Sequence, residues 1–179
     1  MKFLRTAVRN YATVGAVTEI SRYVVEKVIR EMRPDARYIV EYGAGNGTLT
    51  RGILGILPED GRLVAVELLR DFAEELSLIR DGRLTVVWGD ACEVVKDIGA
   101  FHLPRVDVAV SNIPFSLMNG EKRRELIRRT KDILAPGGVF LVYQNVPIVA
   151  RELKQFFPKI SWSFELRNLP PYFVMAAKK

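Results

Sequence analysis

Cysteine and histidine are nearly absent from this sequence of 179 residues, which has one of each, Cys92 and His102. A single cysteine cannot close a disulfide within the chain, and one cysteine with one histidine cannot supply the usual four ligands of a zinc site. We therefore expect no metal centre. We interpret Cys92 as a small buried residue near a strand end and not as a catalytic thiol.

Long hydrophobic runs are missing as well. The longest apolar stretches, residues 106–110 and 139–143, have the length of a strand, whereas a helix that spans a bilayer needs about 20 apolar residues. Residues 1–5 lack the uninterrupted apolar segment and the small-residue cleavage site of a secretory signal. These absences predict a cytoplasmic protein, whose contact with a membrane would be peripheral, at the inner face.

Acidic residues are outnumbered by basic ones, 21 against 27, which gives a formal net charge of +6. An excess of positive charge favours polyanionic partners such as nucleic acid or an anionic membrane surface. Much of the excess lies in residues 122–131 and 178–179, where a solvent-exposed face is a sufficient explanation. Charge alone therefore does not choose between these partners.

Strand-like and helix-like runs alternate along the chain, which is typical of βαβ units and a mostly parallel sheet. The expected strands are residues 37–42, 62–67, 84–88, 106–112 and 139–145. The expected helices are residues 48–57, 70–79, 91–98 and 121–134, the last ended by Pro136-Gly137-Gly138, and then 149–156. Two closing strands, 161–166 and 172–177, would form an antiparallel edge. The sequence thus predicts a doubly wound α/β domain with a seven-stranded, mostly parallel sheet.

A segment of 36 residues precedes the first expected strand, and we assign residues 1–36 to a helical segment that caps the site and residues 37–179 to the core of the same domain. A second helix is expected over 20–32. The first helix would carry an apolar face and a basic face: Leu4, Ala7, Val8 and Tyr11 against Lys2, Arg5 and Arg9. Such a helix suits a membrane interface, although it could equally pack its apolar stripe on the domain.

A glycine-rich turn follows the first expected strand, in the sequence Glu41-Tyr42-Gly43-Ala44-Gly45-Asn46-Gly47. Glycines at alternate positions let the backbone approach a ligand closely where a strand turns into a helix. Dinucleotide-binding enzymes use a related turn. Glu41 distinguishes an adenosyl cofactor from a dinucleotide, because a carboxylate beside a negatively charged pyrophosphate would not help to bind it. We expect Glu41 to face the amino-acid end of an adenosyl cofactor.

Two further strand ends carry acidic residues. The carboxylate of Glu67, 20 residues beyond Gly47, can accept hydrogen bonds from both hydroxyls of a ribose, and Leu68 follows in the same loop. After the next strand, Asp90 can accept a hydrogen bond from an adenine amino group while the backbone N–H of Ala91 donates to the ring. Glu67 could instead be a surface charge and Asp90 a helix N-cap. Together the three strand ends favour an adenosyl sulfonium cofactor.

These stretches, residues 40–47, 64–67 and 89–91, resemble the successive motifs of class I S-adenosylmethionine-dependent methyltransferases, which implies a Rossmann-like fold, transferase activity and S-adenosylmethionine as the cofactor. At the fourth strand end, Ser111-Asn112-Ile113-Pro114-Phe115 resembles the Asn-x-Pro-aromatic motif of amino-group methyltransferases, including the ribosomal RNA adenine dimethyltransferases. That resemblance implies that Asn112 and the carbonyl beside Pro114 hold the target nitrogen and that Phe115 stacks on a base. Asn112 would also contact the cofactor.

Other stretches resemble the small bacterial phospholipid N-methyltransferases, which convert phosphatidylethanolamine toward phosphatidylcholine: Phe3-Leu4-Arg5, Arg9-Asn10, Thr13-Val14-Gly15-Ala16-Val17 and Arg167-Asn168-Leu169-Pro170-Pro171. The chain length agrees with that family. The RNA dimethyltransferases carry a further C-terminal helical domain and a Gln-Asn-Phe-Leu type segment that residues 13–21 do not contain. The departure from the lipid enzymes is residues 112–115, where those enzymes more often have Gly-Leu-Pro.

The resemblance therefore implies N-methylation of the amine headgroup of phosphatidylethanolamine or a similar lipid at the membrane surface. Methylation of adenine N6 in RNA is the first alternative, and a non-catalytic binding module on the same fold is the second. For the lipid reaction, the carbonyls of Asn112 and Ile113 would accept amine hydrogens, and Tyr11 or a water would take the proton. Tyr11 could equally be an aromatic anchor. Lys2, Arg5 and Arg9 would attract an anionic membrane.

Overall fold

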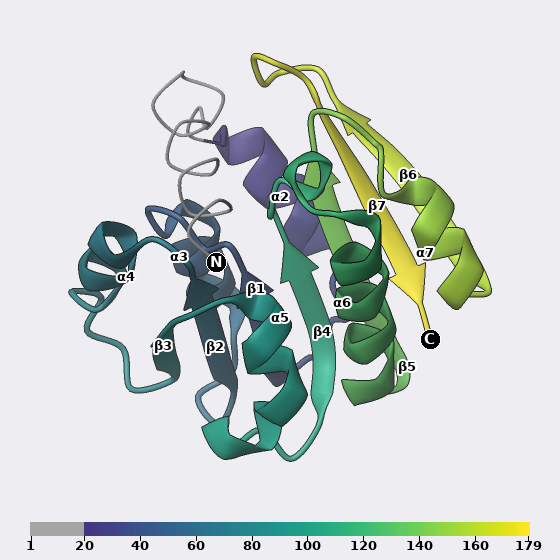
Figure 1. Cartoon of the computed structure of the whole chain (residues 1–179). Coiled ribbons are helices and arrows are strands. Elements are labelled where there is room, and N and C mark those ends of the chain that lie inside the picture. The colour runs from purple at the N-terminus through teal and green to yellow at the C-terminus, as the bar shows by residue number, and fades with distance from the viewer. Residues whose placement is uncertain (1–19) are drawn as a thin grey trace.

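Seven strands form one sheet in the computed structural model of the protein, which describes residues 20–179 (Figure 1). The strands are β1 (Tyr38–Tyr42), β2 (Arg62–Glu67), β3 (Leu84–Trp88), β4 (Val106–Ser111), β5 (Leu134–Gln144), β6 (Lys159–Glu165) and β7 (Tyr172–Lys178). Their order across the sheet is β3-β2-β1-β4-β5-β7-β6. The first five are parallel, while β7 is antiparallel to both β5 and β6. The predicted parallel sheet with an antiparallel closing edge is confirmed.

Helices cover both faces of this sheet. They are α2 (Arg22–Glu31), α3 (Thr48–Ile56), α4 (Arg70–Leu76), α5 (Ala91–Val94), α6 (Gly120–Ile133) and α7 (Ala150–Phe156), with 3-10 turns η1 (Val95–Phe101) and η2 (Phe115–Leu117). In Figure 1, α5, α6 and α7 lie in front of the strands and α2 and α3 behind them. This arrangement is the doubly wound form that the alternation of strand and helix predicts.

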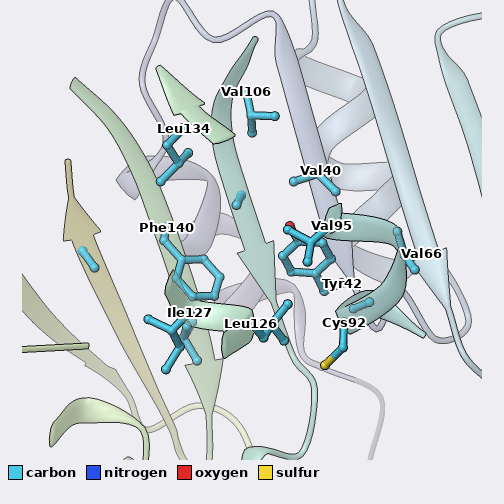
Figure 2. Close-up of a cluster of buried hydrophobic side chains, with 14 of the residues drawn as sticks. Val40, Tyr42, Val66, Cys92, Val95, Val106, Leu126, Ile127, Leu134 and Phe140 are labelled. Carbon is cyan, nitrogen blue, oxygen red and sulfur yellow. The ribbon is translucent and has the colours of Figure 1, made fainter. Parts of the chain in front are cut away.

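The core is divided between the two faces of the sheet because side chains alternate along each strand. On one face, Val40 and Tyr42 of β1 pack with Phe140 and with Leu126 of α6, as Figure 2 shows. On the other, Ile39 of β1 packs with residues of α2 and α3. Every residue of β4 is buried, as expected for a central parallel strand covered on both sides.

The two predicted boundaries that differ most from the structure are wrong for local reasons, while the helix predicted over 70–79 ends at Leu76 and the strand predicted over 161–166 begins at Lys159. Strand β5 begins at Leu134 and not at Val139, because residues 134–139 form an irregularity in which Val106 pairs with Leu134 while Val108 pairs with Val139. Gly137 supplies the positive φ of 72° at this irregularity. The predicted helix over 91–98 ends at Val94 as an α-helix and continues as η1, which Asp97 interrupts with non-helical angles.

The predicted basic helix with Lys2, Arg5, Arg9 and Tyr11 lies outside the described residues, and so does most of the segment proposed to cap the site. The second predicted helix, over 20–32, corresponds to α2. Within residues 20–179, no helix has both the length and the apolar character that crossing a bilayer requires. Over the same range, histidine, cysteine and carboxylate side chains form no group of three that could hold a metal ion.

Candidate active site

A cavity of about 410 Å³ opens at the carboxyl ends of the parallel strands. Strand β1 has β2 as its neighbour on one side and β4 on the other, so the order of the strands reverses at β1. Open α/β sheets bind ligands at this kind of reversal in strand order. The cavity is lined by the predicted cofactor residues Gly43, Ala44, Gly45, Asn46, Glu67, Leu68, Asp90, Ala91 and Asn112, and by the predicted acceptor residues Ile113 and Pro114.

The glycine turn is held against β2 by backbone hydrogen bonds. The N–H of Gly43 donates to the carbonyl of Val66 at 2.8 Å. Gly45 has a φ of +56°, and a Cβ built on it would meet no atom within 4 Å, so its open side faces free space in the cavity lining. Gly47 does not line the cavity. It begins α3 with a φ of +81°, and a Cβ there would lie 2.8 Å from Leu76 of α4.

Glu67 ends β2 with its carboxylate fixed by the glycine turn. Its Oε2 accepts the N–H of Gly45 and its Oε1 accepts the N–H of Leu69, both at 2.8 Å. The side chain is 5% exposed, and burial raises the pKa of its carboxyl while these backbone donors oppose the rise. A carboxylate offers about four lone-pair sites, so two backbone donors leave room for two ribose hydroxyls.

Asp90 is a helix N-cap whose position also fits the predicted contact with adenine. It is the N-cap of α5, with Oδ1 accepting the N–H of Cys92 at 2.9 Å, and it also lines the cavity beside Ala91. The cap fixes the carboxylate at the start of a helix, where it can meet an adenine edge. Cys92 also lines the cavity, and burial raises the pKa of its thiol to about 12, so it is no nucleophile at neutral pH.

Glu41 lies beneath the lining of the cavity and is 1% exposed. Its Oε2 accepts the hydroxyl of Thr50 at 2.7 Å, while its Oε1 is buried and has no partner among the described residues. Burial raises the pKa of its carboxyl to about 8. A buried carboxylate oxygen without a donor can accept a hydrogen bond from the ammonium group at the cofactor's amino-acid end, directly or through a water. The open side of Gly45 leaves space for an adenosyl ligand.

We expect Glu41→Gln to stabilise the ligand-free protein at alkaline pH. Because the pKa of this carboxyl is raised in the folded state, the wild type binds the proton more tightly when folded and loses stability as pH rises from the unfolded value toward about 8. The variant lacks this loss, so its melting temperature should exceed the wild type's by about 5 °C at about pH 9. The difference should shrink toward about pH 5, and a difference independent of pH would contradict the assignment.

The end of the cavity where the acceptor is predicted to bind, which we call the acceptor end, is built after β4. The N–H of Asn112 donates to the carbonyl of Tyr42 at 3.2 Å, and the N–H of Ile113 donates to the hydroxyl of Ser111 at 3.2 Å. These bonds fix the backbone on either side of the Asn112 side chain. Phe115 is fully buried in the core cluster with Tyr42, and it does not line the cavity. The structure therefore places its ring below the lining, away from a position for stacking on a base.

Gln144, which the sequence reasoning missed, also reaches this end of the cavity. Its Nε2 donates to the carbonyl of Ile113, and its Oε1 is buried without a partner among the described residues. The side chain lines the cavity and is 7% exposed. Because Ser111 pairs with Val142, Gln144 lies level with Ile113 on the next strand. The sequence signal that could have found Gln144 is its position as a polar residue at the end of the apolar run of β5.

No family model matches the chain, but its fold is shared with solved structures. The chain superposes on the O-methyltransferase TomG of Streptomyces achromogenes, solved with S-adenosylmethionine, with a TM-score of 0.71 at 17% identity over 100% of this chain and 90% of that one. It superposes on spermidine synthase with a TM-score of 0.71 at 16% identity, over 88% of this chain and 60% of that one. At such identities these likenesses establish the fold.

With its sheet order, its strand-end motifs and a relative that aligns over its full length, the chain is a class I S-adenosylmethionine-dependent methyltransferase. That relative is the ornithine lipid N-methyltransferase of Singulisphaera acidiphila. The two are 29% identical over 184 residues, which cover 99% of this chain and 96% of the relative.

Other relatives match only part of the chain. The probable ribosomal RNA small subunit methyltransferase A of Haloquadratum walsbyi is 35% identical over 46% of this chain and 26% of its own length. The protein of the same name from Pyrobaculum islandicum is 33% identical over 52% of this chain and 35% of its own. The chain therefore spans about a third or less of these proteins.

Proposed function

We propose that the protein transfers a methyl group from S-adenosylmethionine to the amine nitrogen of a membrane lipid. The observation that carries the proposal is the alignment with an ornithine lipid N-methyltransferase over almost the whole of both chains. Two ribosomal RNA methyltransferases align over about half of this chain, and a third, from Pyrobaculum aerophilum, aligns over 83% of it at 26% identity but over only 62% of its own length. An ornithine lipid and phosphatidylethanolamine both present a primary amine and are the two acceptors to compare.

At the cofactor end of the cavity, residues of this chain would bind and orient S-adenosylmethionine. Glu67 would accept the ribose hydroxyls, Asp90 and Ala91 would meet the adenine edge, and the bare turn at Gly45 would admit the ligand close to the backbone. When bound, S-adenosylmethionine supplies a methyl group already activated on a sulfonium. The protein then needs mainly to align the nucleophile with that methyl group and to exclude water.

At the acceptor end, the amine must present a lone pair, although a primary amine with a pKa of about 10 is mostly protonated at neutral pH. The amide oxygens of Asn112 and Gln144 are neutral acceptors that can hold amine N–H groups without stabilising the ammonium form as a carboxylate would. The Gln144 bond to the Ile113 carbonyl fixes the amide so that Oε1 is the free acceptor. Methylation moves the methyl group from sulfur to nitrogen, and the amine proton passes to water or to Tyr11.

A specific segment favours RNA as the alternative acceptor. Residues 112–115, Asn-Ile-Pro-Phe, resemble the motif of adenine N-methyltransferases, and ribosomal RNA relatives align with between about half and 83% of the chain. The buried position of Phe115 weakens this alternative, because a ring in the core cannot stack on a base without moving.

A single partition experiment separates these acceptors. The full chain is incubated with methyl-labelled S-adenosylmethionine and, in parallel, with anionic vesicles containing ornithine lipid, vesicles containing phosphatidylethanolamine, unmodified RNA and a protein lysate. We expect label in the organic phase of at least one vesicle arm, on the lipid nitrogen. Label found in the RNA arm alone would replace the lipid proposal with RNA methylation, and label in no arm would leave the binding module.

A further inference from the structure

Exposed apolar side chains gather at one corner of the protein. Nine large hydrophobic residues are exposed among the described residues, and six of them lie in the stretches 146–148 and 162–169. We call these six the apolar rim: Val146, Ile148, Trp162, Phe164, Leu166 and Leu169. Leu166 and Leu169 are 70% and 86% exposed on the turn between β6 and β7. Single exposed apolar residues are ordinary, but a group of this size marks an interaction surface.

The two stretches of the rim emerge at the same end of three neighbouring strands. Gln144 at the end of β5 pairs with Phe173 near the start of β7, and Phe173 pairs with Phe164 near the end of β6. The rings of Phe164 and Phe173 lie 4.6 Å apart, and Trp162 meets Phe173 edge-on at 6.5 Å. In Figure 1 the β6–β7 turn and the segment leaving β5 stand at the same upper edge.

The rim borders the acceptor end of the cavity. Asn145, which precedes Val146, lines the cavity, and so does Tyr172, three residues after Leu169. Gln144, with its free amide oxygen, lies one residue before that loop. A surface that the rim contacts would therefore lie directly beside the entrance through which an acceptor amine must come.

The residues around the rim fit a lipid surface with anionic headgroups. Arg167 lies within the β6–β7 turn, where it pairs with the carboxylate of Glu165 at 2.8 Å, yet its side chain is 62% exposed and its guanidinium lies 4.1 Å from the ring centroid of Tyr23. Arg22, the first residue of α2, and Arg151, in the first turn of α7, are exposed too. Tryptophan and phenylalanine beside leucine favour the boundary between headgroups and acyl chains, and arginines there can pair with lipid phosphates.

We propose that the apolar rim inserts into an anionic membrane, with Leu166 and Leu169 deepest, and that it holds the cavity entrance against the headgroups. The inference rests on the proposed lipid acceptor and names the surface through which that acceptor is reached. It assigns membrane docking to the β5–α7 and β6–β7 loops, in addition to any contribution from Lys2, Arg5 and Arg9.

Trp162 provides a direct reporter for this contact. The chain has two tryptophans, and Trp88→Phe removes the other, which donates to the carbonyl of Leu68 at 3.2 Å. In this background the full chain is titrated with vesicles of phosphatidylcholine and phosphatidylglycerol, which carry no primary amine. We expect the emission of Trp162 to shift to shorter wavelength and to be quenched by brominated acyl chains, because the indole moves out of water.

Charged substitutions at the turn test the same contact by affinity. Leu166→Asp and Leu169→Asp together should weaken vesicle binding at least ~10-fold, since two leucines that bury apolar area become charged. Leu78→Asp is the matched control, because Leu78 is 76% exposed and lies after α4, outside the rim. Its vesicle affinity should stay within about twofold of the wild type's, far from the tenfold loss expected for the rim variant.

The outcomes are separable from those of the proposed function. Vesicle affinity unchanged by both rim substitutions, or a Trp162 emission unaffected by vesicles, would overturn the docking surface. An emission shift that grows with protein concentration in the absence of lipid would assign the rim to a second copy of the chain and also overturn it. Rim-dependent vesicle binding with label transferred to RNA alone would contradict the lipid acceptor while leaving the docking surface in place.

Discussion

Glu67→Gln should weaken binding of S-adenosylmethionine by ~100-fold, because hydrogen bonds to a charged group contribute about 1.5–3 kcal/mol each and every 1.4 kcal/mol is about tenfold in affinity. The wild-type carboxylate is held by the N–H groups of Gly45 and Leu69. The amide of the variant can accept from one of them but turns its NH₂ toward the other, so the variant loses both the charge and the orientation that two ribose hydroxyls need.

Isothermal calorimetry of the purified full chain measures this effect directly. Glu74→Gln is the matched control, because Glu74 is exposed on α4, pairs with Arg70 and does not line the cavity. Its cofactor affinity should equal the wild type's. If the affinity of Glu67→Gln stays within about threefold of the wild type's, the loss is smaller than the tenfold that corresponds to about 1.4 kcal/mol. That result would remove Glu67 from the cofactor site.

Asn112→Ala should lower turnover by ~100-fold, since misplacing the acceptor by about 1 Å has an effect of this size. Asn112 lines the cavity, as Gln144 does, and its backbone is fixed by the bond to the carbonyl of Tyr42. Because Glu67, Asp90 and the glycine turn remain, cofactor affinity should fall only a fewfold. The split between turnover and affinity is the signature of a residue that positions the acceptor.

Single-turnover methyl transfer at saturating cofactor separates the two effects. Gln155→Ala, which removes an exposed amide on α7 outside the cavity, is the control and should transfer at the wild-type rate. Equal losses in transfer rate and cofactor affinity for Asn112→Ala would argue that Asn112 belongs to the cofactor end and not to the acceptor clamp.

The cofactor end could be predicted from the sequence because it depends on the ends of parallel strands. Once the alternation of strand and helix is recognised, Gly45, Glu67 and Asp90 must meet at one edge of the sheet. Their placement in the cavity lining follows from topology alone. Glu41 lies one layer lower than expected, because side chains alternate along β1 and its own points under the turn toward Thr50.

The acceptor end was harder to predict because it depends on register and on short turns. Gln144 reaches Ile113 only through the pairing of β4 with β5, which the irregularity at residues 134–139 sets. Phe115 turns into the core because η2 follows Pro114 directly, a detail that no periodicity in the sequence reports. The start of β5 was misplaced for a similar reason, since Pro136-Gly137-Gly138 lies within the strand and not in a free turn.

The central claim is that an adenosyl cofactor binds in the cavity over β1, β2 and β3. A crystal structure of the full chain with S-adenosylhomocysteine tests it most directly. We predict both ribose hydroxyls within hydrogen-bonding distance of the Glu67 carboxylate and the adenine beside Asp90 and Ala91. Electron density for the ligand at any other place, or a glycine turn closed over an empty cavity at saturating ligand, would contradict the claim.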